Sequence, residues 1–280
     1  MQTDYVQRFL FEDLDIRGRL VCLTTAWQSM LQGRGYPDGI VGLLGHTTAL
    51  NVLLGANQKG AGRVTMQVQG TGPVKLLVSD CTSDLRIRGM ATYENDSANQ
   101  AVERALLGDG RLSVTLEDMK SGKFYQSLVP LEGETMAQIF EHYLSQSEQV
   151  PSFLRLYADK EALCGLLLEK LPDADSRDAD GWNRVTLLAN TLRLDETRDA
   201  QPYDLLTRIF PEELMRVFRL FGVEYHCPYD EDTVKNMRRG LGRQEVESIL
   251  AERGEVVIRN EMCNHEYRFD ARQIAEMFAA

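Results

Sequence analysis

The stretch GRVTMQVQGTGPVKLLVSDC, residues 62–81, decides the fold class. Its first half alternates apolar and polar side chains, so that Val64, Met66 and Val68 fall on one side of an extended chain. This period of two predicts a half-buried strand. The tripeptide TGP then predicts a turn, and residues 74–80 predict the returning strand of a hairpin.

A second hairpin and a later helix complete this pattern. RLSVTLED (111–118) and KFYQSLVPL (123–131) are separated by a Ser-Gly pair and read as two paired strands. Apolar residues recur at helical spacing in residues 133–150, and Pro151 ends that helix. Since this much antiparallel pairing precedes any long helix, the sequence predicts an α+β fold rather than a doubly wound sheet.

Charge and hydropathy exclude several classes of function. The net charge of −11 disfavours a nucleic-acid-binding protein and an anionic membrane surface as partner. The apolar runs are shorter than the roughly 20 residues of a membrane-spanning helix. The N-terminus has acidic residues where a signal peptide would be basic and apolar. We therefore expect a cytoplasmic protein with no nucleic-acid or membrane partner.

The five cysteines do not form a secreted disulfide framework, because their number is odd and their spacing wide. Cys22, Cys81 and Cys164 lie in apolar surroundings and are interpreted as small, buried, reduced side chains. Cys227 and Cys263 lie near the C-terminus in more polar sequence. These two cysteines are the candidates for metal binding or redox chemistry.

Three parts are predicted along the chain. Residues 1–171 form an α+β core domain, residues 172–223 an acidic boundary followed by a helical linker, and residues 224–280 a small C-terminal module. The boundary is placed at PDADSRDADG (172–181), which is nearly free of apolar residues.

The linker is expected to contain short amphipathic helices. WNRVTLLANTL (182–192) places Val185, Leu188 and Leu192 on one side of a helix. PEELMRVFRLF (211–221) begins with a proline at a favourable first helical position and has apolar residues at helical spacing. These apolar faces must pack on the core domain or on each other.

The C-terminal module is predicted as a helix, two strands and a second helix. QEVESILAERG (244–254) is the first helix, and EVVIRN (255–260) and EYRF (266–269) are the strands. The last helix starts at Asp270, with Gln273 three residues later as in a capping box. A unit this small has little core and usually needs a metal or a crosslink for stability.

Several long segments, in a fixed order, carry a family resemblance. They are QRFLFEDLDIRGRLVCL (7–23), the hairpin at 62–81 with RIRGMA (86–91), LEGETMAQIFEHYLSQSEQVPSFLRL (131–156), and later VEYHCP, EVESILAERGEV and CNHEYRFDARQIAEMF. Together they resemble the redox-regulated heat-shock chaperones of the 33-kDa (HslO-type) family. The resemblance implies a core domain, a helical linker, a small zinc domain and no enzymatic activity.

The resemblance also implies a mechanism. In that family, four cysteines arranged as C-x-C and C-x-x-C hold zinc in the reduced, inactive state. Oxidation forms two disulfides and expels the zinc, the small domain and linker unfold, and apolar surface binds unfolding clients. Unfolded or misfolded proteins are therefore the expected partners, and a homodimer of the activated form is a further expectation.

Only two of the four cysteine positions are kept in this chain. Cys227 matches the first position and Cys263 the last, whereas Tyr229 stands at the second and Asn260 at the third. Structural zinc takes four ligands, drawn mainly from thiolate and imidazole groups. Whether zinc binds here is therefore open.

Three states of this site remain open. A zinc ion would need His226 and His265 as substitute ligands beside Cys227 and Cys263, although His226 is adjacent to Cys227 and poorly spaced for joint chelation. A disulfide between the two cysteines would close a loop of 35 intervening residues and stabilise the module by about 3 to 4 kcal/mol. In the third state both thiols stay reduced and apolar contacts alone hold the module.

The function expected from these features is that of an ATP-independent holding chaperone. Stress would unfold the linker and the C-terminal module, with a weakened or altered redox switch. The candidate client-binding residues are Trp182, Leu188, Phe218 and Phe221, since large apolar patches are interaction sites. The alternative is a thiol- or metal-dependent enzyme using Cys227 and Cys263, but acidic neighbours raise a thiol pKa and reduce its reactivity.

Overall fold

The computed structural model describes residues 4–57, 60–94, 102–197, 200–227 and 243–279. They belong to two compact units, residues 1–226 and 227–280, which are described separately. The predicted α+β class is confirmed. The finer division of the first unit into a core and a linker at residues 171 and 172 stays a prediction. Within the described ranges, no helix has the length and apolar character needed to cross a membrane.

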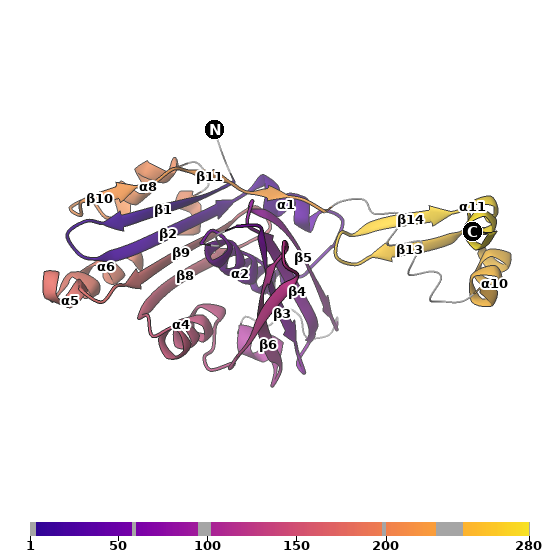
Figure 1. Cartoon of the computed structure of the whole chain (residues 1–280), viewed down its shortest axis with the longest axis horizontal. Coiled ribbons are helices and arrows are strands. Elements are labelled where there is room, and N and C mark those ends of the chain that lie inside the picture. Colours follow the sequence, from indigo (N-terminus) through magenta and orange to yellow (C-terminus); the bar gives the residue numbers. More distant parts are fainter. Residues whose placement is uncertain (1–3, 58–59, 95–101, 198–199, 228–242, 280) are drawn as a thin grey trace. The chain divides into compact units, whose positions relative to one another are not determined.

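One of the two sheets of the first unit, called sheet A, brings together strands from both ends of that unit (Figure 1). Its order is β10-β1-β2-β9-β8, and β11 also pairs with β1. All of these pairings are antiparallel. The strands are β1 (Tyr5–Phe11), β2 (Ile16–Leu23), β8 (Ser152–Ala158), β9 (Leu163–Lys170), β10 (Met215–Val217) and β11 (Phe221–Gly222).

The second sheet, called sheet B, contains both predicted hairpins. Its order is β12-β5-β4-β3-β6-β7, and only the β12–β5 pairing is parallel. The strands are β3 (Gly62–Gln69), β4 (Val74–Thr82), β5 (Arg86–Tyr93), β6 (Arg111–Asp118), β7 (Lys123–Val129) and β12 (Glu224–Tyr225). Val64, Met66 and Val68 are fully buried, as their alternation predicts.

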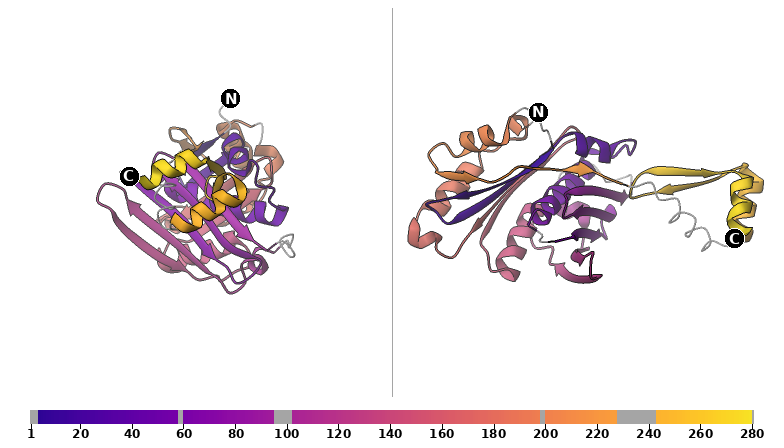
Figure 2. Two further views of the ribbon diagram at one scale, coloured as in Figure 1. Left: turned by 90° about the vertical axis from the view of Figure 1, so that its right-hand side faces the viewer. Right: turned by 45° about the horizontal axis from the view of Figure 1, so that its top comes forward.

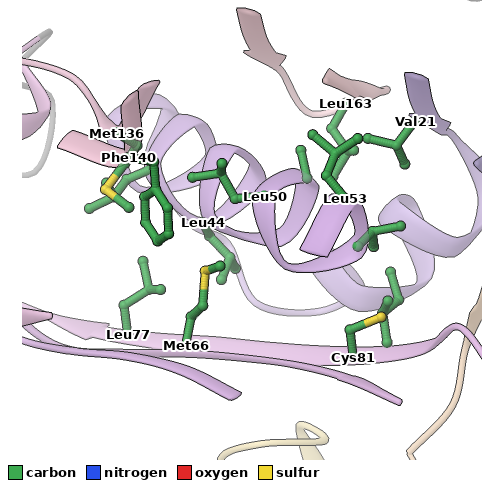
Figure 3. Close-up of a cluster of buried hydrophobic side chains, with 14 of the residues drawn as sticks. Val21, Leu44, Leu50, Leu53, Met66, Leu77, Cys81, Met136, Phe140 and Leu163 are labelled. Carbon is green, nitrogen blue, oxygen red and sulfur yellow. The ribbon is translucent and has the colours of Figure 1, made fainter. Parts of the chain in front are cut away.

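Helix α2 (Asp38–Gly55) lies between the two sheets and forms the centre of the main core (Figure 3). It packs against Met66 and Leu77 of sheet B and against Val21 and Leu163 of sheet A. The expectation that no long helix precedes residue 133 is therefore wrong. A helix covered by sheets on two sides is apolar almost all round, so it lacks the one-sided period that reveals surface helices.

The remaining helices near the main core are short. They are α1 (Thr25–Leu31), α3 (Glu103–Leu107) and α4 (Met136–Ser147). Helix α4 confirms the helix predicted within residues 133–150. It begins after Thr135, whose hydroxyl oxygen accepts a hydrogen bond from the Gln138 backbone N–H.

The other face of sheet A is covered by α5 (Ala174–Arg177), α6 (Gly181–Ala189), α7 (Leu194–Thr197) and α8 (Pro202–Ile209). These helices and Phe210 are called the helical cover, and they lie on the opposite side of sheet A from α2 (Figure 2). The cover contributes Val185, Ala189, Leu192, Leu205, Leu206, Ile209 and Phe210 to a second core. The sheet contributes Tyr5, Phe9, Phe11, Ile16, Leu20, Cys22, Cys164, Leu166 and Leu168.

Residues 211–221 do not form the predicted helix. They return as β10 and β11 along the outer edge of β1, where Val217 pairs with Phe9 and Phe221 with Val6. Pairing supplies the hydrogen bonds that the edge of β1 would otherwise lack, and this outweighs the helical spacing of the apolar residues.

The second unit has the predicted order of helix, hairpin and helix. The elements are α10 (Arg243–Arg253), β13 (Val256–Asn260), β14 (His265–Phe269) and α11 (Ala271–Ala279). Gly254 ends the first helix with a φ of 76°. The capping box is also confirmed: the Gln273 N–H donates to Asp270 Oδ1 at 2.8 Å, and the Asp270 N–H donates to Gln273 Oε1 at 3.0 Å.

Among the residues that the structure describes, the second unit has a small core. The buried apolar side chains that form it are Val256, Tyr267, Phe269 and Ile274, with Ile249, Leu250 and Ile258 packed around them. A unit as short as residues 227–280 can bury little apolar surface, which limits the stability that packing alone gives it.

Candidate functional site

Cys227 and Cys263 form a disulfide within the second unit. Their Cα atoms are 5.6 Å apart, inside the range that disulfides adopt. Cys263 is buried in the turn between β13 and β14, and Cys227 is half-buried at the start of the unit. The role of the pair as a redox site stays a prediction.

Asn260, at the third cysteine position of the family pattern, builds the turn that presents Cys263. Its side-chain Oδ1 accepts hydrogen bonds from the backbone N–H groups of Met262 at 3.0 Å and Cys263 at 3.3 Å. Asn264 follows with a φ of 56°, the left-handed conformation that asparagine tolerates. The Asn260 side chain therefore organises the turn.

The described residues do not fit a zinc site. The two sulfur atoms are bonded to each other, whereas a metal requires free thiolates. The backbone N–H of His226 donates to the Ile87 carbonyl at 3.0 Å, which places His226 in the first unit, and His265 pairs with Asn260 in the β13–β14 ladder. Nowhere in the described part of the chain do three or more His, Cys, Asp or Glu side chains come together as candidate ligands. Tyr229 lies outside the described residues.

The four candidate client-binding residues fall into two groups. Trp182 and Leu188 belong to the helical cover and pack, partly buried, against the second core. Phe218 and Phe221 lie along the outer edge of sheet A and are 42% and 37% exposed. The guanidinium of Arg8 lies 5.3 Å from the centre of the Phe221 ring. The structure therefore does not bring all four onto one buried face.

An aromatic cluster, which the sequence analysis missed, connects the cover to sheet A. The Phe210 ring packs edge-on against Phe11 with ring centres 4.9 Å apart, and it lies 6.1 Å from the Phe9 ring. All three side chains are almost fully buried. Phe210 is far from the other two in sequence, so no local pattern could have revealed this contact.

Strand β7 carries a second apolar surface that the sequence analysis missed. Phe124, Tyr125 and Leu128 are 72%, 67% and 67% exposed on this edge strand of sheet B. The sequence contained a usable signal of this surface, because positions 124 and 125 are both apolar. A strand with one buried face would alternate apolar and polar residues instead. Edge strands with apolar side chains are sites where other chains can add.

Cys22, Cys81 and Cys164 are buried and free, as their apolar surroundings predict. Burial raises the pKa of the Cys81 thiol to about 12, and the nearby Asp80 and Asp84 carboxylates add to this effect. At neutral pH this thiol is therefore protonated and unreactive.

Comparisons with known proteins agree with this architecture. The family model described as Hsp33 protein matches residues 4–270. The 33 kDa chaperonin of Methylobacillus flagellatus is 37% identical over 278 residues, covering 99% of this chain and 94% of the relative. That of Chromobacterium violaceum is 38% identical over 277 residues, covering 98% and 94%.

A solved structure shares the fold. The crystal structure of the 33 kDa chaperonin from Thermotoga maritima superposes with a TM-score of 0.81 at 20% identity, covering 99% of this chain and 98% of the other. The matches define the class of this protein as a holding chaperone, which binds other proteins and catalyses no reaction. Within that class, the chain belongs to the Hsp33 family.

Family membership decides one earlier alternative and supports the expected partners. Because the family is not enzymatic, the thiol- or metal-dependent enzyme using Cys227 and Cys263 is set aside. A chaperone of this family is a stress-response protein, and its partners are unfolded client proteins.

Proposed function

We propose that this chain is an ATP-independent, stress-activated holding chaperone of the cytoplasm, in which stress unfolds the helical cover and the 227–280 unit. The observation that carries the proposal is the apolar face of sheet A beneath the cover. Once uncovered, this face offers unfolding chains a large apolar surface, and such surfaces bind other proteins. Pairing of the activated form as a homodimer stays a prediction.

The helical cover can unfold readily because its helices are short. The longest of them, α6, has nine residues, and α5 and α7 have four each. Isolated helices shorter than about 12 residues are marginal in water, so these helices persist only while they pack on the sheet. Loss of that packing should therefore unfold the cover as a unit.

Polar contacts contribute less than apolar packing to the closure of the cover. Arg184 of α6 pairs with Asp178 at 3.0 Å and with Glu213 at 2.6 Å, and its side chain is 38% exposed. The pair with Asp178, whose side chain is 33% exposed, contributes about 0 to 1 kcal/mol, whereas the Glu213 side chain is 9% exposed and its pair with Arg184 is less screened by solvent. Apolar packing is therefore the main interaction that stress must overcome.

The test of chaperone function is a light-scattering assay with a heat-denatured client enzyme and no ATP. We expect the protein to suppress client aggregation after brief mild heating, and to have less effect when it is added unheated to a chemically unfolded client. No suppression after heat, peroxide or reductant would contradict the proposal.

We further propose that the Cys227–Cys263 bond closes the 227–280 unit instead of opening it. The bond encloses a sequence separation of 36 residues, for which the chain-entropy model gives about 3 to 4 kcal/mol of stabilisation. The unit has a small apolar core, so this contribution is a large share of its stability. Its redox response is then opposite to the one that the family resemblance implies.

Reduction of this bond is expected to loosen the second unit. With dithiothreitol, or in Cys263→Ser, amide hydrogen exchange in β13 and β14 should become at least tenfold faster, and client binding should begin at a lower temperature. The control is dithiothreitol treatment of Cys263→Ser. The exchange rates of this variant should not change further, because it has no Cys227–Cys263 bond to reduce. Equal or slower exchange after reduction would show that the bond does not close the unit.

A further inference from the structure

Two of the three free cysteines lie side by side beneath the helical cover. Cys22 of β2 and Cys164 of β9 are directly opposite in the antiparallel register, and their Sγ atoms are 3.1 Å apart. Opposite residues in antiparallel strands have Cα atoms about 4.5 to 5.5 Å apart, within the range that disulfides adopt. A disulfide has a sulfur–sulfur length of about 2.05 Å, so bond formation requires a movement of only about 1 Å.

The surroundings of this pair protect it from oxidation while the cover is closed. Cys22 is 3% exposed and Cys164 is fully buried. Thr197 of the cover lies against Cys164, and burial, together with the neighbouring Cys22, raises the pKa of the Cys164 thiol. Tyr5 and Tyr157 are the cross-strand neighbours on either side, so the pair is flanked by two rings. In the closed form, neither oxidant nor base has access to the sulfur atoms.

We propose that Cys22 and Cys164 are a second redox-modification site: a buried dithiol that hydrogen peroxide oxidises to a disulfide between β2 and β9 once the helical cover opens. This rests on the proposed function only in that stress opens the cover. The site is distinct from Cys227 and Cys263, which lie in the other unit.

The reaction consumes one peroxide and releases two water molecules. The Cys22 thiolate attacks one peroxide oxygen, the O–O bond breaks, and Cys22 becomes a sulfenic acid while the departing hydroxide takes up the thiol proton. The Cys164 thiolate then attacks the Cys22 sulfur, the S–O bond breaks, and the second hydroxide takes up the Cys164 proton. Peroxide gains two electrons, one from each sulfur atom.

Cys22 is assigned the first step because its side chain is the more accessible of the two. The product would join two neighbouring strands of sheet A whose cysteines are 142 residues apart in sequence. It would form while the client-binding face is uncovered and would keep these strands paired during stress.

Cys81 is a matched control within the same chain. It is as fully buried as Cys164, but it lies in the main core and not under the cover. Cys22 and Cys164 contact each other, whereas Cys81 lies in a separate cluster. Oxidation of Cys81 should therefore not produce an intramolecular crosslink.

The test is differential alkylation and mass spectrometry of the full chain after peroxide treatment, at 25 °C and after mild heating. We expect less than one tenth of the Cys22 and Cys164 thiols to be lost at 25 °C. After heating, both should be lost in equal amounts, and a Cys22–Cys164 linked peptide should appear that dithiothreitol cleaves. In Cys164→Ala, Cys22 should stop at a sulfenic acid that dimedone traps.

The Phe210→Ala variant removes the need for heat, since it loosens the cover by mutation and should give the linked peptide at 25 °C. The proposal is overturned if both thiols remain alkylatable in the heated protein and in this variant, or if they oxidise singly without a linked peptide. Client aggregation is measured in the same samples. Suppression without the crosslink would overturn this inference alone and leave the proposed chaperone function intact.

Discussion

Replacing Phe210 by alanine is expected to release the helical cover without heat and to give a constitutively active chaperone. The Phe210 side chain is 1% exposed and packs against Phe9 and Phe11 of sheet A. Removing a buried phenylalanine side chain costs about 3 to 5 kcal/mol. That loss falls on the contact between cover and sheet, on which the short helices α6 and α8 depend for their stability.

Hydrogen exchange and light scattering test this expectation together. The amides of α6 and α8 should exchange at least a hundredfold faster in Phe210→Ala, and the variant should suppress client aggregation at 25 °C without prior stress. The matched control is Tyr203→Ala, which removes an aromatic ring that is 61% exposed on α8. Exposed positions of this kind change stability by about 0.5 kcal/mol or less. A Phe210→Ala protein that still needs heat would disprove the role of the cover.

A second large loss of stability in the first unit is expected from Glu169→Ala. Arg19 is 5% exposed, donates to the Leu53 carbonyl at 2.6 Å, and pairs with the Glu169 carboxylate. Arg17 adds a second contact to the same carboxylate at 2.8 Å. Removal of the Glu169 side chain takes away the carboxylate that pairs with the buried Arg19 guanidinium. Breaking a buried ion pair in this way costs about 3 to 5 kcal/mol.

Urea unfolding of three variants measures this cost. Glu169→Ala should lower the free energy of unfolding by about 3 to 5 kcal/mol. The control is Glu117→Ala, whose carboxylate is 40% exposed and 3.9 Å from Arg63, and which should change stability by about 0 to 1 kcal/mol. The double variant Arg19→Leu/Glu169→Leu should recover most of the loss, because it removes both buried charges. If Glu169→Ala is no worse than the control, the pair does not stabilise the fold.

The same pair predicts a dependence of stability on pH. Burial alone would raise the pKa of Glu169, but hydrogen bonds and charges from Arg17 and Arg19 outweigh it and hold the pKa below its ordinary value of 4.5. A carboxyl group with a depressed pKa in the folded state stabilises the fold above that ordinary value and loses its contribution as the pH falls through the folded-state pKa. Urea midpoints of the native protein and Glu169→Ala should therefore converge as the pH falls below 4.5 and through the depressed pKa of Glu169.

Local periodicity was enough to predict the hairpins of sheet B and the elements of the second unit. The alternation in β3 and the capping box at Asp270 each lie within a few residues of sequence, and both are found in the structure. The resemblance to a known family supplied the function and directed attention to Cys227 and Cys263. The residues alone did not decide between zinc, a disulfide and free thiols.

Features that depend on distant contacts could not be predicted in this way. Helix α2 has no one-sided apolar face because sheets cover it on two sides. Residues 211–221 have helical spacing but form strands because the edge of β1 is available for pairing. The contact between Cys22 and Cys164 depends on the register of β2 against β9, and two apolar segments so far apart in sequence do not reveal their register.

The pairing of β10 and β11 with β1 has a consequence for biosynthesis. Strand β1 pairs with almost the last segment of its unit, since the contact of Gln7 with Phe218 spans 211 residues of chain. Until that segment emerges, the nascent polypeptide carries an open strand edge, which is a site for unwanted association. Translation of the first unit must therefore be nearly complete before the edge of β1 is covered.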